Sequence, residues 1–396
     1  MDINYLEIRS SITPVNSIFI GEFFREIERE GNFKLKSVTK EEWVNSDFNL
    51  VYIATGGTEG IFLDNIDLFT KNTCYILTSG ESNSLAASME ILSYLQQNNK
   101  KGEILHGDSA TIAKRINTIY KVNKAIKNFK GKRLGIFGKP SDWLISSVYN
   151  KDYLLEKFDI TLVEVPMNEV IREIKLNLYD ETKDTIRLKS MKYDIVEVDK
   201  SLYVYGGLKR LVERFNLDGF TIRCFDLLDS VNTTGCLGLA ILNSEGIFSG
   251  CEGDVPALLS MIILNNISGH PVFQCNPSRI NLKRNEMVLA HCTLPLNLPY
   301  EFNLTTHYES GIGVAIAGLI PIGDMTIFKT SGSLDRYYVN NGTIIRNLKE
   351  SNLCRSQILI KLDDFSYFTS NPISNHHLIC TGNYKEEIEE FFKNLN

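Results

Sequence analysis

Over the first two-thirds of the chain, short apolar runs rich in β-branched residues alternate with amphipathic stretches. The runs at 50–54 and 74–78 each end in a polar or glycine-containing turn, and the stretch 85–97 carries apolar residues at helical spacing. Strands that alternate with helices indicate open parallel α/β sheets, in which ligands gather at the carboxyl ends of the strands.

The alternating pattern restarts after a basic stretch that ends at Arg133. Further strands are expected at 134–137, 159–165 and 219–225. A long charged helical segment is expected at about 168–193. The pattern therefore predicts a first Rossmann-like domain over residues 1–130 and a second over residues 131–232.

Beyond residue 232 the apolar runs become short and strand-like, and most of the prolines follow residue 255. One apolar helix is expected at 255–267 and an acidic amphipathic helix at 385–395. Strands are expected at 272–275, 287–290, 313–320, 326–328, 357–362 and 377–380. This pattern of short apolar runs and prolines predicts a β-rich C-terminal domain over 233–396 that is largely antiparallel and barrel-like.

Composition and charge narrow the class of protein. A net charge of -6 over 396 residues gives no reason to expect nucleic acid or an anionic membrane as a partner. The eight cysteines lack the CxxC spacing of a zinc ribbon or the arrangement of a secreted disulfide framework. No signal-peptide pattern opens the chain and no apolar run could span a bilayer, so we expect a cytoplasmic protein.

The candidate chemistry lies in the C-terminal third, where five of the six histidines follow an acidic motif at 251–256. Glu252 and Asp254 are two residues apart, so one could bind a metal while the other caps the following helix; alternatively, both are capping residues. His291 ends a strand-like run. In the doublet His376-His377 only one ring can face a given site, because side chains alternate along a strand. A carboxylate and two histidines suit manganese, iron or cobalt.

Two polar loops are further candidates for binding. Ser82, Asn83 and Ser84 precede a helix and could bind a sugar hydroxyl or an anion; alternatively, Ser84 is simply its N-cap. Trp143 follows a strand on a polar loop and could stack on a sugar ring; alternatively, it closes a domain interface.

At these residues the chain resembles the L-fucose isomerase and L-arabinose isomerase superfamily, in particular its shorter fucose isomerase-like members. The resemblance covers nearly the whole chain. It rests on the motifs at 54–59, 83–87, 138–145, 251–257, 276–279, 288–292, 307–311 and 375–377.

The resemblance implies two Rossmann-like domains, a β-rich C-terminal domain and a divalent metal, typically Mn²⁺. It implies aldose–ketose interconversion through a cis-enediol. It also implies a homo-oligomer, a hexamer or trimer, with active sites at subunit interfaces.

The metal ligands implied by the resemblance are Glu252, His291 and His377. The second acidic ligand of the family falls at or beside Asn276, where this chain departs from the pattern. An amide oxygen can contact a metal but cannot act as a base, so Glu252 is left as the proton carrier, with Asp254 as an alternative. Arg279, the Ser82–Ser84 loop, Trp143, His307 and Glu309 are candidate substrate contacts.

The leading hypothesis is therefore a metal-dependent sugar isomerase. The substrate could be a deoxy sugar or an anionic one such as a sulfonated hexose. An anionic substrate would offset the charge of the bound cation, which a neutral amide leaves less neutralised. A catalytically reduced sugar-binding or regulatory protein is an alternative, motivated by Asn276. A metal-dependent epimerase or aldolase would use the same site.

Overall fold

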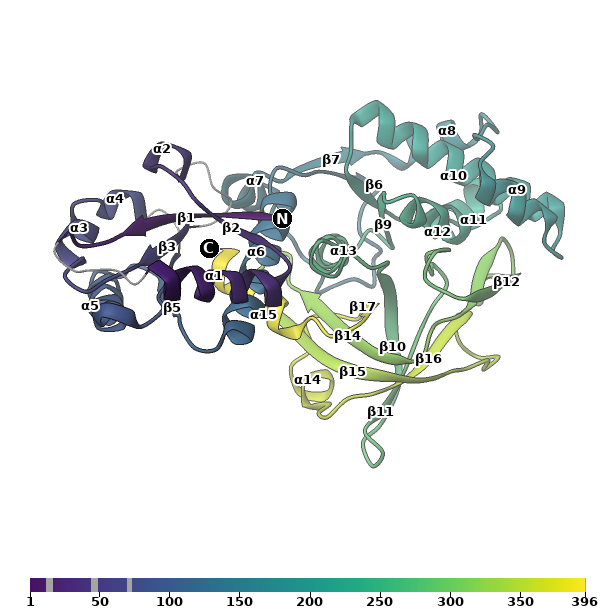
Figure 1. The fold of residues 1–396 in the computed structure, drawn as a ribbon. Helices are drawn as coiled ribbons and strands as arrows, with labels where there is room; N and C mark the ends of the chain where they lie inside the picture. Colours follow the sequence, from purple (N-terminus) through teal and green to yellow (C-terminus); the bar gives the residue numbers. More distant parts are fainter. Residues whose placement is uncertain (12–16, 44–48, 70–72, 396) are drawn as a thin grey trace. The chain divides into compact units, whose positions relative to one another are not determined.

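The computed structural model describes residues 1–11, 17–43, 49–69 and 73–395. Two parallel sheets with helices and a closed antiparallel barrel make up the fold, so the predicted fold class is confirmed (Figure 1). The chain divides into two compact units, residues 1–124 with the stretch from Glu390 onward, and residues 125–389. The three-domain division with boundaries at 130 and 232 stays a prediction. Among the described residues, no helix has both the length and the apolar character needed to cross a membrane.

The first unit contains a five-stranded parallel sheet in the order β2-β1-β3-β4-β5. The strands are β1 (Asp2–Ile8), β2 (Lys34–Ser37), β3 (Asn49–Ile53), β4 (Cys74–Leu77) and β5 (Gly102–Leu105). The helices are α1 (Ser17–Gly31), α2 (Lys40–Trp43), α3 (Glu59–Leu63), α4 (Ile66–Phe69), α5 (Ser84–Gln97) and α6 (Ser109–Phe129). Leu50 and Tyr52 of β3 join the hydrophobic cluster on one face, whereas Val51 and Ile53 join the cluster on the other. Burial on both faces explains why β3 is a continuous apolar run.

The second unit begins with a four-stranded parallel sheet in the order β7-β6-β8-β9. The strands are β6 (Arg133–Phe137), β7 (Thr161–Val165), β8 (Gly219–Ile222) and β9 (Phe248–Cys251). The helices are α7 (Lys151–Phe158), α8 (Met167–Ile174), α9 (Lys183–Ser190), α10 (Ile195–Phe215), α11 (Asp226–Val231) and α12 (Cys236–Ser244). This sheet takes its last strand from residues beyond 232, because β9 pairs with β8.

The prediction of a single helical segment at 168–193 is wrong. Two short helices, α8 and α9, occupy it, and the long helix of this region is α10. Asn177 adopts a φ of 54°, a left-handed conformation that ends a helix. On sequence grounds Gly206 and Gly207 disfavour a helix, but they let α10 approach its neighbours closely. A Cβ at Gly207 would lie 2.9 Å from the backbone nitrogen of Ile174 in α8.

The C-terminal part of the second unit is a closed six-stranded barrel in the order β10-β11-β16-β15-β14-β17. The strands are β10 (Phe273–Asn281), β11 (Glu286–His291), β14 (Gly323–Thr330), β15 (Tyr337–Asn347), β16 (Ser356–Lys361) and β17 (His377–Thr381). The remaining elements are β12 (Glu301–Thr305), β13 (Ala315–Leu319), α13 (Val255–Ser268), α14 (Ser366–Ser370) and α15 (Lys385–Leu395). Helix α13 packs against β14 and β17 of the barrel and against β9 of the parallel sheet (Figure 1).

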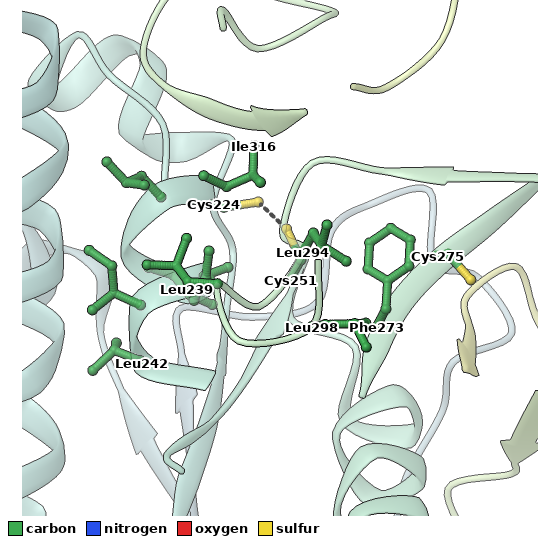
Figure 2. Packing of buried hydrophobic residues seen from close by; sticks show 14 of the residues in the cluster. Cys224, Leu239, Leu242, Cys251, Phe273, Cys275, Leu294, Leu298 and Ile316 are labelled. Atoms are coloured by element: carbon green, nitrogen blue, oxygen red, sulfur yellow. Dashed lines mark hydrogen bonds between the residues drawn. The ribbon is translucent and has the colours of Figure 1, made fainter. Parts of the chain in front are cut away.

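One hydrophobic cluster runs from the helices beside the second parallel sheet into the barrel (Figure 2). It joins Leu239 and Leu242 of α12 to Phe273 of β10 and Ile316 of β13. Cys251, the last residue of β9, lies inside the same cluster. The motif that follows Cys251 is therefore held by the packing of both layers.

Candidate functional site

Glu252 and Gly253 form a left-handed turn between β9 and α13. Their φ angles are 64° and 73°. A Cβ at Gly253 would lie 2.7 Å from both the carbonyl oxygen of Lys139 and the Cα of Pro140, so only glycine fits. The Glu252 carbonyl accepts a hydrogen bond from the Ser141 amide at 2.9 Å. A non-glycine residue held at positive φ is strained, which is typical of residues placed for function.

Glu252, His291 and His376 converge from three elements, and all three are buried. Glu252 follows β9, His291 is the last residue of β11, and His376 immediately precedes β17. Oε1 of Glu252 lies 3.4 Å from Nε2 of His376 and 4.0 Å from Nε2 of His291. One candidate ligand atom from each residue lies within 4.8 Å of the others, a spacing that a single metal ion can fill.

Asp254 orients the His376 ring. Its Oδ1 accepts from the Ala257 amide at 2.8 Å and so caps α13, while its Oδ2 lies 2.9 Å from Nδ1 of His376. With Nδ1 engaged, Nε2 is the nitrogen that faces Glu252. This Nε2 is buried, and its contact with Glu252 is an ion pair at 3.4 Å without good hydrogen-bond geometry, as expected of two atoms placed to bind one cation.

Lys329 is an unexpected member of the site. Its side chain in β14 is fully buried, and Nζ lies 3.5 Å from Oδ2 of Asp254. Burial raises the pKa of the Asp254 carboxyl, but the Lys329 charge and the His376 hydrogen bond outweigh burial and hold this pKa below its usual value. Asp254 therefore stays ionised and keeps the His376 ring in place.

The two histidines beside Glu252 differ in charge preference. Burial lowers the pKa of His291 to about 4, so its ring is neutral near pH 7 and can donate a lone pair. Burial also lowers the pKa of His376, but the Asp254 hydrogen bond and the Glu252 carboxylate outweigh it and raise this pKa to about 9. A cation at Nε2 would therefore displace a proton from His376.

His377 points elsewhere. Its Nδ1 lies 3.0 Å from the carbonyl oxygen of Asn375, and its Nε2 lies 3.0 Å from the hydroxyl of Tyr367. Burial lowers the pKa of the His377 ring to about 3. Both ring nitrogens are thus engaged away from Glu252, and the structure brings His376 rather than His377 to the candidate site.

Trp143 contacts the Glu252 carboxylate, and Asn276 lines the cavity beside it. The Trp143 indole donates to Oε2 of Glu252 at 2.5 Å, although half of its side chain is exposed. Its ring also packs edge-on against Phe225, with 5.0 Å between centroids. Asn276, in β10, accepts a 3.4 Å hydrogen bond from the Asn375 side chain. Trp143 therefore orients the Glu252 carboxylate, a contact that the sequence did not reveal.

A cavity opens at Glu252. Five of the lining side chains belong to residues predicted to bind metal or substrate: Glu252, Asn276, His291, His307 and Glu309. Five more are thiols, at Cys224, Cys236, Cys251, Cys292 and Cys354. None of the described residues that line this cavity is a lysine or an arginine.

Other predicted substrate contacts are not among the residues that line this cavity. Arg279 forms an exposed ion pair with Glu350, at 2.7 Å, and does not line the cavity. Ser82, Asn83 and Ser84 belong to the first unit, at the carboxyl end of β4. Their roles stay predictions. Ser84 is the first residue of α5 rather than its N-cap, and its hydroxyl accepts from Thr78 at 2.7 Å.

Comparison with known proteins gives partial similarity to one kind of enzyme. No protein-family model matches the chain. The sulfoquinovose isomerase of Alkalicoccus urumqiensis is 23% identical over 220 residues, which are 53% of this chain and 49% of that protein. The sulfoquinovose isomerase of Priestia aryabhattai is 21% identical over 241 residues, 58% of this chain and 54% of that protein.

A shorter similarity joins the chain to the sulfoquinovose isomerase of Clostridium sp. (strain MSTE9), 26% identical over 146 residues, 35% of this chain and 33% of that protein. The chain spans about half the length of the first two curated relatives. These names agree with the sugar-isomerase part of the resemblance, while the superfamily itself stays a prediction.

Proposed function

We propose that this protein is an aldose–ketose isomerase that acts on a sulfonated sugar and uses a divalent cation, most simply Mn²⁺. The observation that carries the proposal is the convergence of Glu252, His291 and His376, of which Glu252 and His291 line a cavity. The relatives named sulfoquinovose isomerase support both the reaction class and the sulfonated substrate.

The residues present fit a divalent cation. Glu252, His291 and His376 would hold it, and the strongest sign of the fit is that Nε2 of His376 is buried with the Glu252 carboxylate 3.4 Å away. A cation bound there supplies positive charge for two adjacent sugar oxygens and for the negative charge that develops in the enediol. Asn276 lines the same cavity and would contact the cation or the substrate through its amide oxygen.

Glu252 is the proposed proton carrier. It would take the proton from C2 of the aldose, so that the electron pair forms the C1–C2 double bond of a cis-enediol while the carbonyl oxygen gains a proton. Return of the proton to C1, with loss of the C2 hydroxyl proton to solvent, then places the carbonyl at C2, with no net oxidation or reduction. One base on one face of the sugar suffices for this transfer, and Trp143 holds its carboxylate in a fixed orientation.

We assign Asp254 a positioning role instead of a basic one. Its side chain is fully buried, and its oxygens are engaged by Ala257, His376 and Lys329. No substrate atom could reach it without breaking these contacts. Its task is to hold His376 with Nε2 toward Glu252.

The test is isomerisation of sulfoquinovose by the purified protein with Mn²⁺ in D₂O, followed by NMR. The expected result is a ketose product with deuterium incorporated from solvent, and a loss of at least about 100-fold in kcat for Glu252→Gln, because the amide cannot accept the proton. Unchanged turnover of this variant would contradict the proposed base.

A sugar-binding protein without turnover is the second candidate, and Asn276 favours it because an amide replaces the expected carboxylate. Calorimetry separates the two functions. Sulfoquinovose binding that persists after chelation, with no deuterium exchange at C2, would support a binding protein and contradict the isomerase. An epimerase or aldolase would be recognised by its products.

A further inference from the structure

A second group of metal-binding side chains lines the same cavity as Glu252 but shares no residue with the first group. Cys236 is the first residue of α12, Cys292 follows β11, and His307 lies in the loop between β12 and β13. All three are buried, and one candidate ligand atom from each lies within 4.8 Å of the others. The two sulfur atoms are 3.2 Å apart. The proposed isomerase chemistry uses neither thiol.

Hydrogen bonds and an ion pair fix the orientation of the His307 ring. Its Nδ1 lies 3.0 Å from the Ser310 hydroxyl, so Nε2 is the nitrogen that would bind a cation, in place of its present contact with Glu309. Oε2 of Glu309 lies 2.9 Å from this Nε2. The other oxygen of Glu309 accepts from the Cys354 thiol at 3.5 Å. The Glu309 carboxylate therefore lies between the His307 imidazole and the Cys354 thiol.

We propose that Cys236, Cys292 and His307 form a second cation site that takes Zn²⁺, with Glu309 as its fourth ligand. Two thiolates, an imidazole and a carboxylate are a donor set that zinc accepts in tetrahedral geometry. Zinc–sulfur bonds of about 2.3 Å place tetrahedral sulfur atoms roughly 3.8 Å apart, so the two thiols need to separate by only about half an ångström.

The donor sets distinguish the two sites. Thiolates select soft or borderline cations such as Zn²⁺, whereas the carboxylate and imidazoles around Glu252 also accept Mn²⁺. A cation bound by Cys236, Cys292 and His307 would link α12 beside the parallel sheet to β11 of the barrel and to the β12–β13 loop. The site thus acts as a cross-link within the second unit, and its filling stabilises the folded state.

Cys224 and Cys251 provide a matched control. Their sulfur atoms are 3.1 Å apart and line the same cavity (Figure 2). Among the described residues, however, they do not belong to a group of three or more metal-binding side chains. Both cysteine pairs therefore bring two thiols close together, but only Cys236 and Cys292 have a third metal-binding side chain, His307, beside them.

The test is a Cd²⁺ titration of the fully reduced, metal-free protein, read by the ultraviolet thiolate-to-cadmium charge-transfer absorption. Cd²⁺ reports thiolate coordination directly, and the measurement is independent of isomerase activity. We expect the band in the wild type and in Cys224→Ser. We expect it to be lost in Cys236→Ser and Cys292→Ser and to need at least tenfold more Cd²⁺ in His307→Gln.

Zn²⁺ should also raise the thermal midpoint of the wild type and of Cys224→Ser, but not that of Cys236→Ser. Circular dichroism confirms that each variant is folded before titration. The proposal is overturned if the wild type shows no band, if the band survives in Cys236→Ser and Cys292→Ser, or if Cys224→Ser loses it equally.

Discussion

At the scale of single residues, a buried network fixes the candidate metal site. Asp254 caps α13, contacts His376 and neutralises the fully buried Lys329. Each of these residues is tolerated in the interior only because the others are present, since an unpaired buried charge is strongly unfavourable. The network explains why His376 presents Nε2 rather than Nδ1 to Glu252.

This network predicts the behaviour of Asp254→Asn. Asparagine keeps the helix cap but leaves Lys329 without a countercharge, so the free energy of unfolding should fall by about 3–5 kcal/mol. Asp254→Asn combined with Lys329→Met should recover much of this loss, because both buried charges are then removed. Urea unfolding of the single and double variants measures the coupling, and a double variant no more stable than Asp254→Asn would refute it.

At the scale of elements, the turn between β9 and α13 positions the proposed base. Glycine is required at 253 for two reasons, its positive φ and the close approach of Lys139 and Pro140. The energetic cost of the positive φ and the cost of the close approach can be measured separately by comparison with Gly246. This glycine, in the same unit, also has a positive φ, 86°, but a Cβ there would meet no atom within 4 Å.

Gly246→Ala should therefore lower the free energy of unfolding by about 1–2 kcal/mol, because only the unfavourable positive φ of a non-glycine residue contributes. Gly253→Ala should cost about 1–3 kcal/mol more, because the backbone at 139–140 must move. Chemical denaturation of the two variants gives the difference. Equal losses of stability would show that the contact of Gly253 with Lys139 and Pro140 is unimportant.

At the scale of the whole molecule, the second parallel sheet and the barrel share one hydrophobic core. Phe220 of β8 and Met287 of β11 belong to the same buried cluster. We predict that these layers open together, so peptides from β8 and β11 should give the same opening free energy in native-state hydrogen exchange. A parallel sheet that opens at lower free energy than the barrel would instead support an independent domain over 131–232.

The sequence predicted the fold class and selected Glu252 and His291, which the structure brings together, because an acidic helix start and a strand end are visible in the residue pattern. It could not choose between His376 and His377. That choice depends on the pairing of β17 with β10, which places His377 opposite Cys275, and on the contact with Tyr367. Lys329 was missed because a lysine in a strand is ordinarily exposed, and α10 was missed because two glycines interrupt its pattern.

The central claim is that Glu252, His291 and His376 hold a divalent cation. The most direct test is the Mn²⁺ affinity of His376→Gln and His377→Gln, measured by titration calorimetry on variants shown to be folded. The two rings are equally buried neighbours, so each variant controls for the other. We predict that His376→Gln weakens Mn²⁺ binding by at least about 100-fold and that His377→Gln retains affinity within about threefold of the wild type. Loss of binding in His377→Gln with retention in His376→Gln would contradict the account.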